Sequence, residues 1–317
     1  MFLDEMPLLD SVWVSRLRMT ILGVAIGCTA VAAEFRPRML LLDGAVVGSE
    51  VIAVGERGAI VRSADNGRTW RESARPVRAT LTGVSFAPLT AAPLGWAVGH
   101  DAVIVTTTDG GRTWVKQYQG ENLQDSFLDV LALDAQHVIA VGAYGLFVTT
   151  TDGGKTWVRS RINEGDYHLN RITRGPSGSL YLAGEHGTLL RSGDQGATWA
   201  PIAAPYDGSF YGIVPLGPHT VVAHGLRGHA YLSSDDGGTW QRIASPTEGL
   251  IAAAVKLKSN DVVFAGQART MLVSRDHGRT LVASSNALAT GVAELLELPD
   301  GNLLALGEAG ATVLSKP

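Results

Sequence analysis

The sequence predicts an all-β protein, a seven-bladed β-propeller built from four-stranded antiparallel blades. Two repeated motifs and their spacing carry this prediction. The first is an Asp box of the form S/T-x-D-x-G-x-T-W, which occurs six times, the last time without its Trp. The second is a Gly-x-x-Gly turn, which recurs seven times in full or partial form. A period of about 40–45 residues with four short strands per repeat is typical of a propeller blade.

The Asp boxes recur at steps of 44, 43, 42, 41 and 41 residues. Their key residues are Asp65 and Trp70, Asp109 and Trp114, Asp152 and Trp157, Asp194 and Trp199, Asp235 and Trp240, and Asp276. The Asp carboxylate can accept hydrogen bonds from nearby backbone N–H groups and so fix an Asx-type turn. The Trp that opens the outer strand can pack between neighbouring blades, where a large ring buries much area. We therefore predict a structural role for every box.

The seventh repeat supplies only three strands, Val292–Leu298, Asn302–Leu306 and Ala311–Ser315. An extended segment, Glu34–Leu40, stands ahead of blade one. We predict that this segment pairs with residues 311–315 as the missing outer strand, because such a clasp protects unpaired sheet edges.

The N-terminal region predicts a secretory signal peptide. Arg16 and Arg18 precede an apolar stretch, Met19–Ala33, which ends in small residues. The chain then divides into residues 1–33, an N-terminal extension with the signal peptide, and residues 34–317, the propeller. Export to the periplasm follows. A rival interpretation is lipoprotein processing at Cys28, the single cysteine, which also excludes a disulfide within one chain.

The composition suits a globular protein with a large core. Hydrophobic residues make up 45% of the 317 residues, and the formal net charge is −4. This balance argues against a broad nucleic-acid surface, which needs a basic excess. Gly-x-Ser-x-Gly, Walker and His-Glu-x-x-His motifs are absent, as is a calcium-loop pattern. We predict no catalytic residue, no metal site and no cofactor.

Asp boxes also occur in sialidases, so a carbohydrate-binding or sialidase-like glycosidase propeller is the alternative. Those enzymes carry Phe-Arg-Ile-Pro early in the chain, whereas this chain has Phe35-Arg36-Pro37. Glycoside hydrolysis needs a pair of carboxylates about 5–10 Å apart in an open cleft. That geometry would support the alternative.

The regular pairing of Gly-x-x-Gly turn and Asp box resembles the photosystem II assembly and stability factor family. Residues 95–114 (GWAVGHDAVIVTTTDGGRTW) and 142–157 (GAYGLFVTTTDGGKTW) carry the resemblance best. It implies a non-catalytic seven-bladed propeller that assists assembly of a membrane complex, binding a precursor subunit through an arginine-rich face. Family members of oxygenic phototrophs lie in the thylakoid lumen. We therefore predict a monomeric periplasmic scaffold with a protein partner, which meets the membrane only peripherally or through that partner.

A partner is predicted to bind the face that carries the Gly-x-x-Gly turns and the loops between blades. The predicted contact residues are Arg57, Arg75, Arg78, His100, Tyr144, Arg159, Arg161, Tyr167, Arg171, His186, Tyr211 and Arg227. Arg and Tyr are the residues that most often anchor interfaces. The loop Arg159–His168 is the first choice for contact. A basic cluster of Arg75, Arg78, Arg159, Arg161, Arg171 and Arg174 is predicted to suit an acidic segment of a partner.

Overall fold

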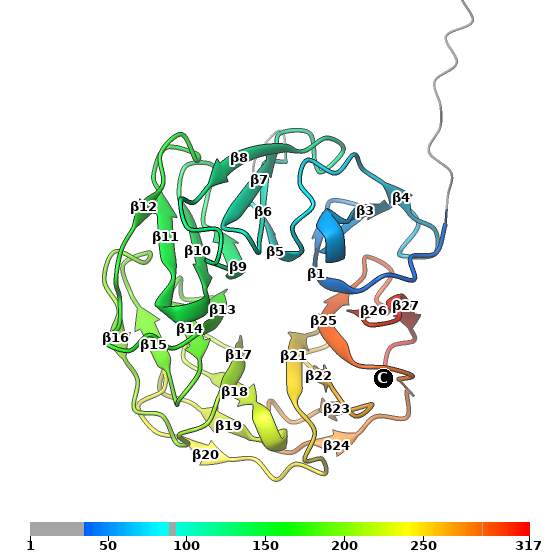
Figure 1. The fold of residues 1–317 in the computed structure, drawn as a ribbon. Helices are drawn as coiled ribbons and strands as arrows, with labels where there is room; N and C mark the ends of the chain where they lie inside the picture. The colour runs from blue at the N-terminus through cyan, green and yellow to red at the C-terminus, as the bar shows by residue number, and fades with distance from the viewer. Residues whose placement is uncertain (1–34, 89–92, 287) are drawn as a thin grey trace, which may run out of the picture. The chain divides into compact units, whose positions relative to one another are not determined.

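The computed structural model describes residues 35–88, 93–286 and 288–317, which form seven antiparallel sheets around a central axis (Figure 1). We call the region enclosed by the innermost strands the channel. Each sheet is one blade, and the strands run in chain order from the channel to the rim. This confirms the predicted seven-bladed propeller. None of the helical turns in the described ranges is long and apolar enough to cross a membrane. The predicted signal peptide, residues 1–33, lies outside the described residues.

The strands repeat in the same order in every blade. The innermost strands are β1 (Leu41–Val47), β5 (Leu81–Phe86), β9 (Phe127–Ala132), β13 (Leu169–Arg174), β17 (Phe210–Pro215), β21 (Ile251–Lys256) and β25 (Val292–Glu297). The second strands are β2 (Glu50–Gly55), β6 (Gly95–Gly99), β10 (Val138–Gly142), β14 (Leu180–Gly184), β18 (Val221–Gly225), β22 (Val262–Gly266) and β26 (Leu303–Gly307).

The third and fourth strands complete each blade toward the rim. The third strands are β3 (Ile60–Ser63), β7 (Val103–Thr107), β11 (Phe147–Thr150), β15 (Leu189–Ser192), β19 (Ala230–Ser233), β23 (Met271–Ser274) and β27 (Gly310–Leu314). The outer strands are β4 (Arg71–Glu72), β8 (Val115–Gln119), β12 (Val158–Arg159), β16 (Ala200–Pro201), β20 (Gln241–Arg242) and β24 (Val282–Ala283). Short 3-10 turns, Glu56–Gly58, Ala143–Gly145 and Leu226–Gly228, join the second strand to the third in blades one, three and five.

Burial follows position in the blade. The second strands read as continuous apolar runs, and β10 is buried along its whole length. Such runs are typical of strands that are covered on both faces, here by the two neighbouring blades. The two-residue outer strands are exposed at the rim, as in β4 and β12. The core therefore lies in seven wedges between adjacent blades.

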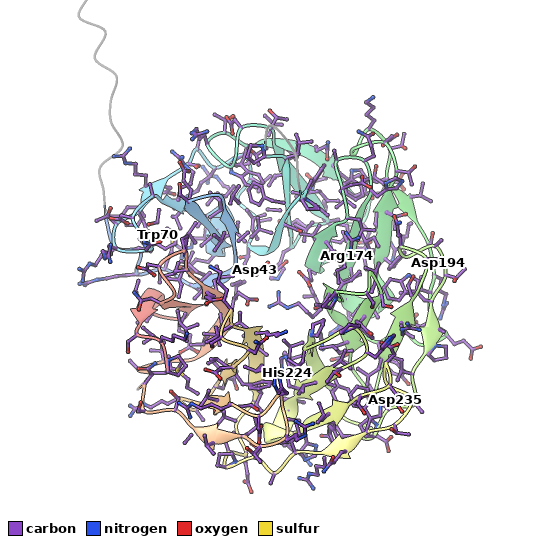
Figure 2. The ribbon with its side chains drawn as sticks, turned by 180° about the vertical axis from the view of Figure 1, so that it is seen from behind. Asp43, Trp70, Arg174, Asp194, His224 and Asp235 are labelled. Atoms are coloured by element: carbon purple, nitrogen blue, oxygen red, sulfur yellow. The ribbon has the colours of Figure 1, made fainter. Side chains whose placement is uncertain are left out.

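The Asp boxes form the turn that the sequence predicts. In blade one, the Ser63 hydroxyl donates to Asp65 Oδ1 at 2.8 Å, and the Thr69 backbone N–H donates to the same oxygen at 2.9 Å. The Thr69 hydroxyl donates to Asp65 Oδ2 at 2.8 Å. The same contacts recur around Asp109, Asp152, Asp194, Asp235 and Asp276. Figure 2 shows Asp194 and Asp235 at the outer rim.

The box tryptophans pack against the preceding blade. Trp114 meets Phe86 edge to face at 6.1 Å within a core shared by blades one and two. Trp199 meets Phe147 of blade three at 5.9 Å in the same way. Aromatic pairs of this kind contribute about 0.5–1.5 kcal/mol beyond their buried area. The predicted inter-blade position of the indoles is confirmed.

Packing joins the first and last blades. Trp70 of blade one is 1% exposed and lies in a core with Leu298 and Leu304 of blade seven. Phe35 forms an antiparallel bridge with Trp70, and an added Cβ at Gly310 would lie 2.1 Å from the carbonyl oxygen of Pro37. The start of the propeller thus lies against blade seven. The described residues record three strands in that blade. Because Glu34 falls outside them, pairing of the N-terminal segment with residues 311–315 stays a prediction.

Candidate functional site

One face of the ring carries both the Gly-x-x-Gly turns and the loops between blades. The Gly145 N–H donates to Tyr167 O at 2.9 Å, and the Gly187 N–H donates to Gly208 O at 2.9 Å. Each bond joins the turn of one blade to the loop that leads into the next. We call this surface the turn face. It is the face on which the sequence places a partner.

Most turns hold a residue with a side chain in the left-handed region. At the second variable position φ is 55° for Arg57, 54° for Tyr144, 50° for His186 and 57° for Arg227. An L-residue in this region costs roughly 1–2 kcal/mol. Strained backbone of this kind clusters at functional sites. The turns therefore present side chains where glycine or asparagine would fit with less strain.

Four of the seven innermost strands place a charged side chain at the same position beside the channel. Every innermost strand carries a bulge at its second residue. The residues at the third position are Asp43, Gly83, Asp129, Arg171, Gly212, Ala253 and Glu294. A Cβ at Gly83 would lie 3.0 Å from the Cα of Asp129, so glycine leaves room for the neighbouring blade to approach. Figure 2 shows Asp43 and His224 beside the channel.

Arg171 of blade four reaches three carboxylates on three other blades. Its Nη1 lies 3.5 Å from Asp43 Oδ1 and 3.7 Å from Asp129 Oδ1. Its Nη2 donates to Glu294 Oε2. The Arg171 side chain is 22% exposed, and the three carboxylates are between 5% and 10% exposed. One guanidinium therefore links blades one, three and seven across the channel.

The carboxylates also accept backbone N–H groups. Asp43 Oδ2 accepts from Val84 of blade two at 2.7 Å, and Asp129 Oδ2 accepts from Ile172 of blade four at 2.9 Å. Burial, opposed by the charge of Arg171, raises the pKa of Asp129 to about 6 and that of Glu294 to about 7. Burial also raises the pKa of Asp43. Because three carboxylates share one cation, the cluster retains protons near neutral pH.

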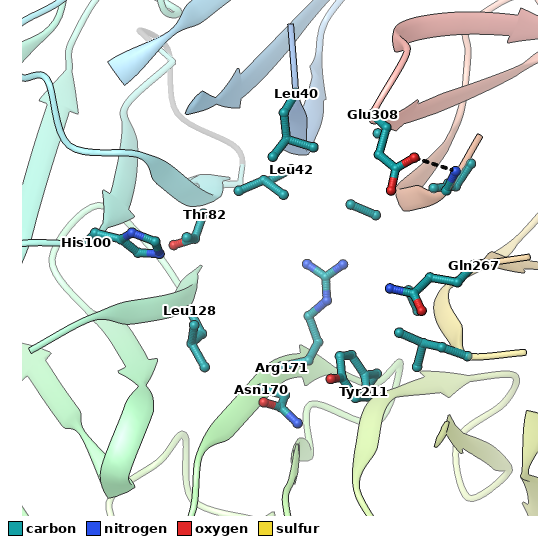
Figure 3. A pocket seen from close by; sticks show the side chains of 16 residues that line it. Leu40, Leu42, Thr82, His100, Leu128, Asn170, Arg171, Tyr211, Gln267 and Glu308 are labelled. Atoms are coloured by element: carbon teal, nitrogen blue, oxygen red, sulfur yellow. Dashed lines mark hydrogen bonds between the residues drawn. The ribbon is translucent and has the colours of Figure 1, made fainter. Parts of the chain in front are cut away.

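A cavity of about 430 Å³ opens at the mouth of the channel on the turn face (Figure 3). Its wall is formed by apolar residues from several blades, with Arg171 in the middle and a few polar side chains around it. The apolar wall includes Leu40, Leu42, Leu128, Leu250 and Val292, and the polar side chains are Thr82, His100, Asn170, Tyr211, Gln267 and Glu308. A concave, mostly apolar surface with a few polar groups is typical of a binding site.

An exposed aromatic strip lies on the turn face over blades three and four. Tyr144 is 68% exposed and meets His168 edge to face at 4.8 Å. Tyr167 is 41% exposed, and the centroid of its ring lies 4.6 Å from that of the His186 ring. The imidazole of His168 is 3.1 Å from Glu185. Exposed aromatic side chains held in place by their neighbours are suited to anchoring a partner.

The predicted contact residues divide into three groups. His100, Arg171 and Tyr211 line the cavity at the channel mouth. Tyr144, Tyr167 and His186 belong to the aromatic strip. The other predicted contacts belong to neither group: Arg159 ends the outer strand β12, and the rest lie on turns and loops, namely Arg57, Arg75, Arg78, Arg161 and Arg227.

The predicted basic cluster needs correction. Arg171 is a channel residue held by carboxylates, and Arg174 lies at the opposite end of β13, where it donates to Leu133 O at 3.4 Å. Arg159 pairs with Asp125 at 2.6 Å, and Arg161 pairs with Asp166 at 3.3 Å. Arg75 pairs with Glu72. The sequence interpretation did not consider these acidic partners, although Glu72 and Asp166 lie within five residues of the arginines they pair with.

The channel carboxylates do not form a glycosidase site. They lie close together around Arg171, yet none of them lines the cavity at the channel mouth. Their oxygens face Arg171 and backbone N–H groups, and glycoside hydrolysis needs two carboxyl groups open to the sugar. Within the described ranges, no group of three His, Cys, Asp or Glu side chains is arranged to hold a metal ion.

The sequence interpretation missed Asp43, Asp129 and Glu294. A signal was present, because a charged residue stands at the third position of four inner strands whose neighbours are mostly apolar. To recognise this signal, one must align the innermost strands at their bulges and know that their third residue lies beside the channel.

Comparison with known proteins agrees with the resemblance in the sequence. Residues 116–256 match the family model of the photosynthesis system II assembly factor YCF48. The matched region runs from the outer strand of blade two through blades three to five to the inner strand of blade six. No curated protein sequence matches the chain.

Solved propeller structures, two of them of YCF48, share the fold. YCF48 from Cyanidioschyzon merolae superposes with a TM-score of 0.72 at 19% identity, covering 90% of this chain and 99% of that one. A structure of YCF48 bound to D1 peptide gives 0.70 at 20% identity, covering 90% and 96%. The WD40 propeller domain of Doa1 gives 0.71 at 14% identity, covering 89% and 95%. These similarities show the fold, and the Doa1 match shows how widely that fold is used.

Proposed function

We propose that this propeller is a non-catalytic assembly scaffold, which holds an exposed segment of a membrane-complex subunit on its turn face. One observation carries the proposal. The turn face carries both the apolar cavity at the channel mouth and the exposed strip of Tyr144, Tyr167 and His186. Preorganised anchors lower the entropy cost of binding. The similarity to YCF48, one structure of which is bound to D1 peptide, supports a peptide-like partner.

The cavity fits an extended segment better than a small substrate. Its polar groups are spread around the wall, and two of them are already used: the Asn170 amide donates to Phe210 O at 2.8 Å, and the Thr82 hydroxyl donates to Phe127 O at 2.9 Å. An apolar side chain of a partner would fill the centre, while the adjoining chain crosses the aromatic strip. The proposal includes export to the periplasm and a monomeric state, which rest on the sequence pattern.

Site-specific photocrosslinking in envelope extracts tests the proposal. A crosslinking amino acid at Tyr144 or Tyr167 is expected to capture one soluble segment of a membrane protein. The same amino acid at Val115, 61% exposed on the outer strand of blade two, is the matched control and should capture none. A synthetic peptide of the captured segment should then bind the purified propeller, with at least about tenfold weaker affinity for the double variant Tyr144→Ala/Tyr167→Ala.

Equal capture at Tyr144 and Val115, or peptide affinity unchanged in the double variant, would contradict the proposal. Both tyrosines are largely exposed, so the variants should keep the thermal unfolding midpoint of the parent. Capture of a polysaccharide in place of a protein segment would favour the carbohydrate-binding alternative.

A further inference from the structure

Blade five carries a second cavity on the turn face, of about 770 Å³. Arg227 comes from the 3-10 turn of that blade, His229 directly precedes β19, and Arg242 comes from β20. The loop between blades five and six closes the remaining side with Ala244, Ser245, Thr247 and Glu248.

Positive charge in this cavity is poorly compensated. Two guanidiniums and an imidazole line it, and Glu248 is the acidic lining residue. Among the described residues, no ion pair joins Arg227 or Arg242 to a carboxylate. Burial lowers the pKa of His229, and the charges of Arg242 and Arg227 lower it further. The imidazole is therefore neutral beside two cations. An anion bound in the cavity would raise the pKa of His229.

The His229 ring is fixed but incompletely bonded. It packs edge to face against Tyr206 at 4.2 Å and against Tyr231 at 6.0 Å. Its Nδ1 is buried without a hydrogen-bond partner. A buried polar atom in this state is costly and calls for an explanation. Packing against the two tyrosine rings restricts rotation of this imidazole.

The turn that carries Arg227 packs tightly against the loop between blades five and six. Gly228 has φ +66°, and a Cβ there would lie 1.9 Å from Thr247 O. Glycine is thus required for the turn to press against the loop. Within that loop the Thr247 hydroxyl accepts the Gly249 N–H at 3.0 Å.

The same positions in other blades are chemically different. Because Tyr231 pairs with Arg242 as Val61 pairs with Glu72, the blade-one equivalents of Arg227, His229 and Arg242 are Arg57, Ala59 and Glu72. Glu72 in turn pairs with Arg75. Where blade one has the carboxylate of Glu72, blade five therefore has the guanidinium of Arg242.

We propose that the blade-five cavity binds an oxyanion, with Arg227 and Arg242 donating charge-assisted hydrogen bonds to it. Such bonds are roughly twice as strong as neutral ones. We assign the oxyanion to a side-chain carboxylate of an acidic partner segment, an assignment that rests on the proposed scaffold function. Oxyanion binding itself does not depend on that function.

Histidine proton NMR of the purified protein tests the site, with the His229 signal assigned from His229→Gln. Replacing chloride by inorganic phosphate at constant ionic strength is expected to raise the His229 pKa by about one unit, with saturation as phosphate increases. The variant Arg242→Gln should weaken the response at least about tenfold. The matched control Arg57→Gln alters the equivalent turn of blade one and should leave the response unchanged.

A capped tetraglutamate peptide then separates the two sources of oxyanion. A rise in the His229 pKa with both the peptide and phosphate supports a partner carboxylate. A response to phosphate alone overturns that assignment in favour of a free inorganic anion. No response to either probe, or an equal response in Arg242→Gln, overturns the site. Crosslinking at Tyr144 and Tyr167 is unaffected by these outcomes, so failure of this site and failure of the scaffold function are distinguishable.

Discussion

Carboxylates at the rim and at the centre of this propeller behave in opposite ways. At the rim, hydrogen bonds from the Thr156 hydroxyl and then the Thr156 N–H lower the pKa of Asp152 to about 2. At the centre, burial raises the pKa of Glu294 to about 7, although Arg171 opposes the shift. The rim carboxylates are satisfied within six residues of chain, whereas the central ones depend on partners more than forty residues away.

This difference separates two tasks. Each box stabilises its own hairpin, so its effect is local and repeated. The central cluster joins blades that are distant in the chain, and it does so with more carboxylates than cations. Removing one partner of a buried charged group is strongly destabilising, since the others stay behind without compensation. The centre should therefore tolerate substitution much less than the rim.

The largest expected effect comes from Arg171→Ala. At pH 8 this change leaves Asp43, Asp129 and Glu294 without their cation and should lower the free energy of unfolding by about 3–5 kcal/mol. At pH 5 the loss should be smaller, because the carboxylates are then largely protonated. Urea denaturation at both pH values measures the difference. Arg174→Ala, at the other end of β13, is the control and should cost less than about 1 kcal/mol. Equal losses for the two variants would refute the central role of Arg171.

A smaller effect is expected on how the free energy of unfolding depends on pH, through Glu294. The folded-state pKa of Glu294 is about 7, above its ordinary value of 4.5. The folded protein then holds a proton that the unfolded chain has lost, so stability decreases as pH rises through this window. Between pH 5 and pH 8 this group should cost roughly 2 kcal/mol. Glu294→Gln should show a correspondingly flatter dependence of the urea midpoint on pH.

His224 serves as a check on that comparison. Burial lowers its pKa to about 4, which makes stability rise with pH up to its ordinary value of 6.5. Since His224 is present in both the parent and Glu294→Gln, its contribution cancels when their two pH profiles are subtracted. Parallel pH profiles for the parent and Glu294→Gln would show that Glu294 does not hold a proton.

The smallest effect is expected at the rim. Asp109→Asn keeps one acceptor for the Thr113 N–H but weakens the bonds from the Thr107 and Thr113 hydroxyls. Solvent screens this site, so the loss should be about 1 kcal/mol at pH 7. The loss should persist until acid protonates Asp109 near its pKa of about 2. Thermal unfolding of single and double box variants would reveal independent boxes as additive losses. A loss of stability for Asp109→Asn as large as that for Arg171→Ala would contradict the proposed difference between rim and centre.

The same contrast explains what the sequence could predict. The Asp boxes, the strand order and the turn face follow from residues that lie within one repeat, so a pattern of about forty residues contains them. The confirmed inter-blade position of Trp114 follows from regular repetition. Arg171 was expected on the binding face for its residue type, and it does line the cavity there. Its partners on other blades had no local signature.

The ion pair between Arg159 and Asp125 was also not predictable from a local sequence pattern. Arg159 and Asp125 are 34 residues apart, and their 2.6 Å contact depends on how two loops meet. Arg174 differs from Arg171 by three positions, yet it lies at the other end of the channel because a strand rises about 3.3 Å per residue. Periodicity predicts on which face of a strand a side chain lies. Its depth along the channel can be predicted only after the blades are aligned at their bulges.

The left-handed turns have a consequence for how such a protein can change. Their conformation is held by backbone bonds, as when the Gly145 N–H donates to Tyr167 O. The side chain at Tyr144, His186 or Arg227 contributes little to the ring itself. Each blade can therefore exchange one chemical group without disturbing the next, and a single architecture can acquire a new ligand by independent steps around its circumference.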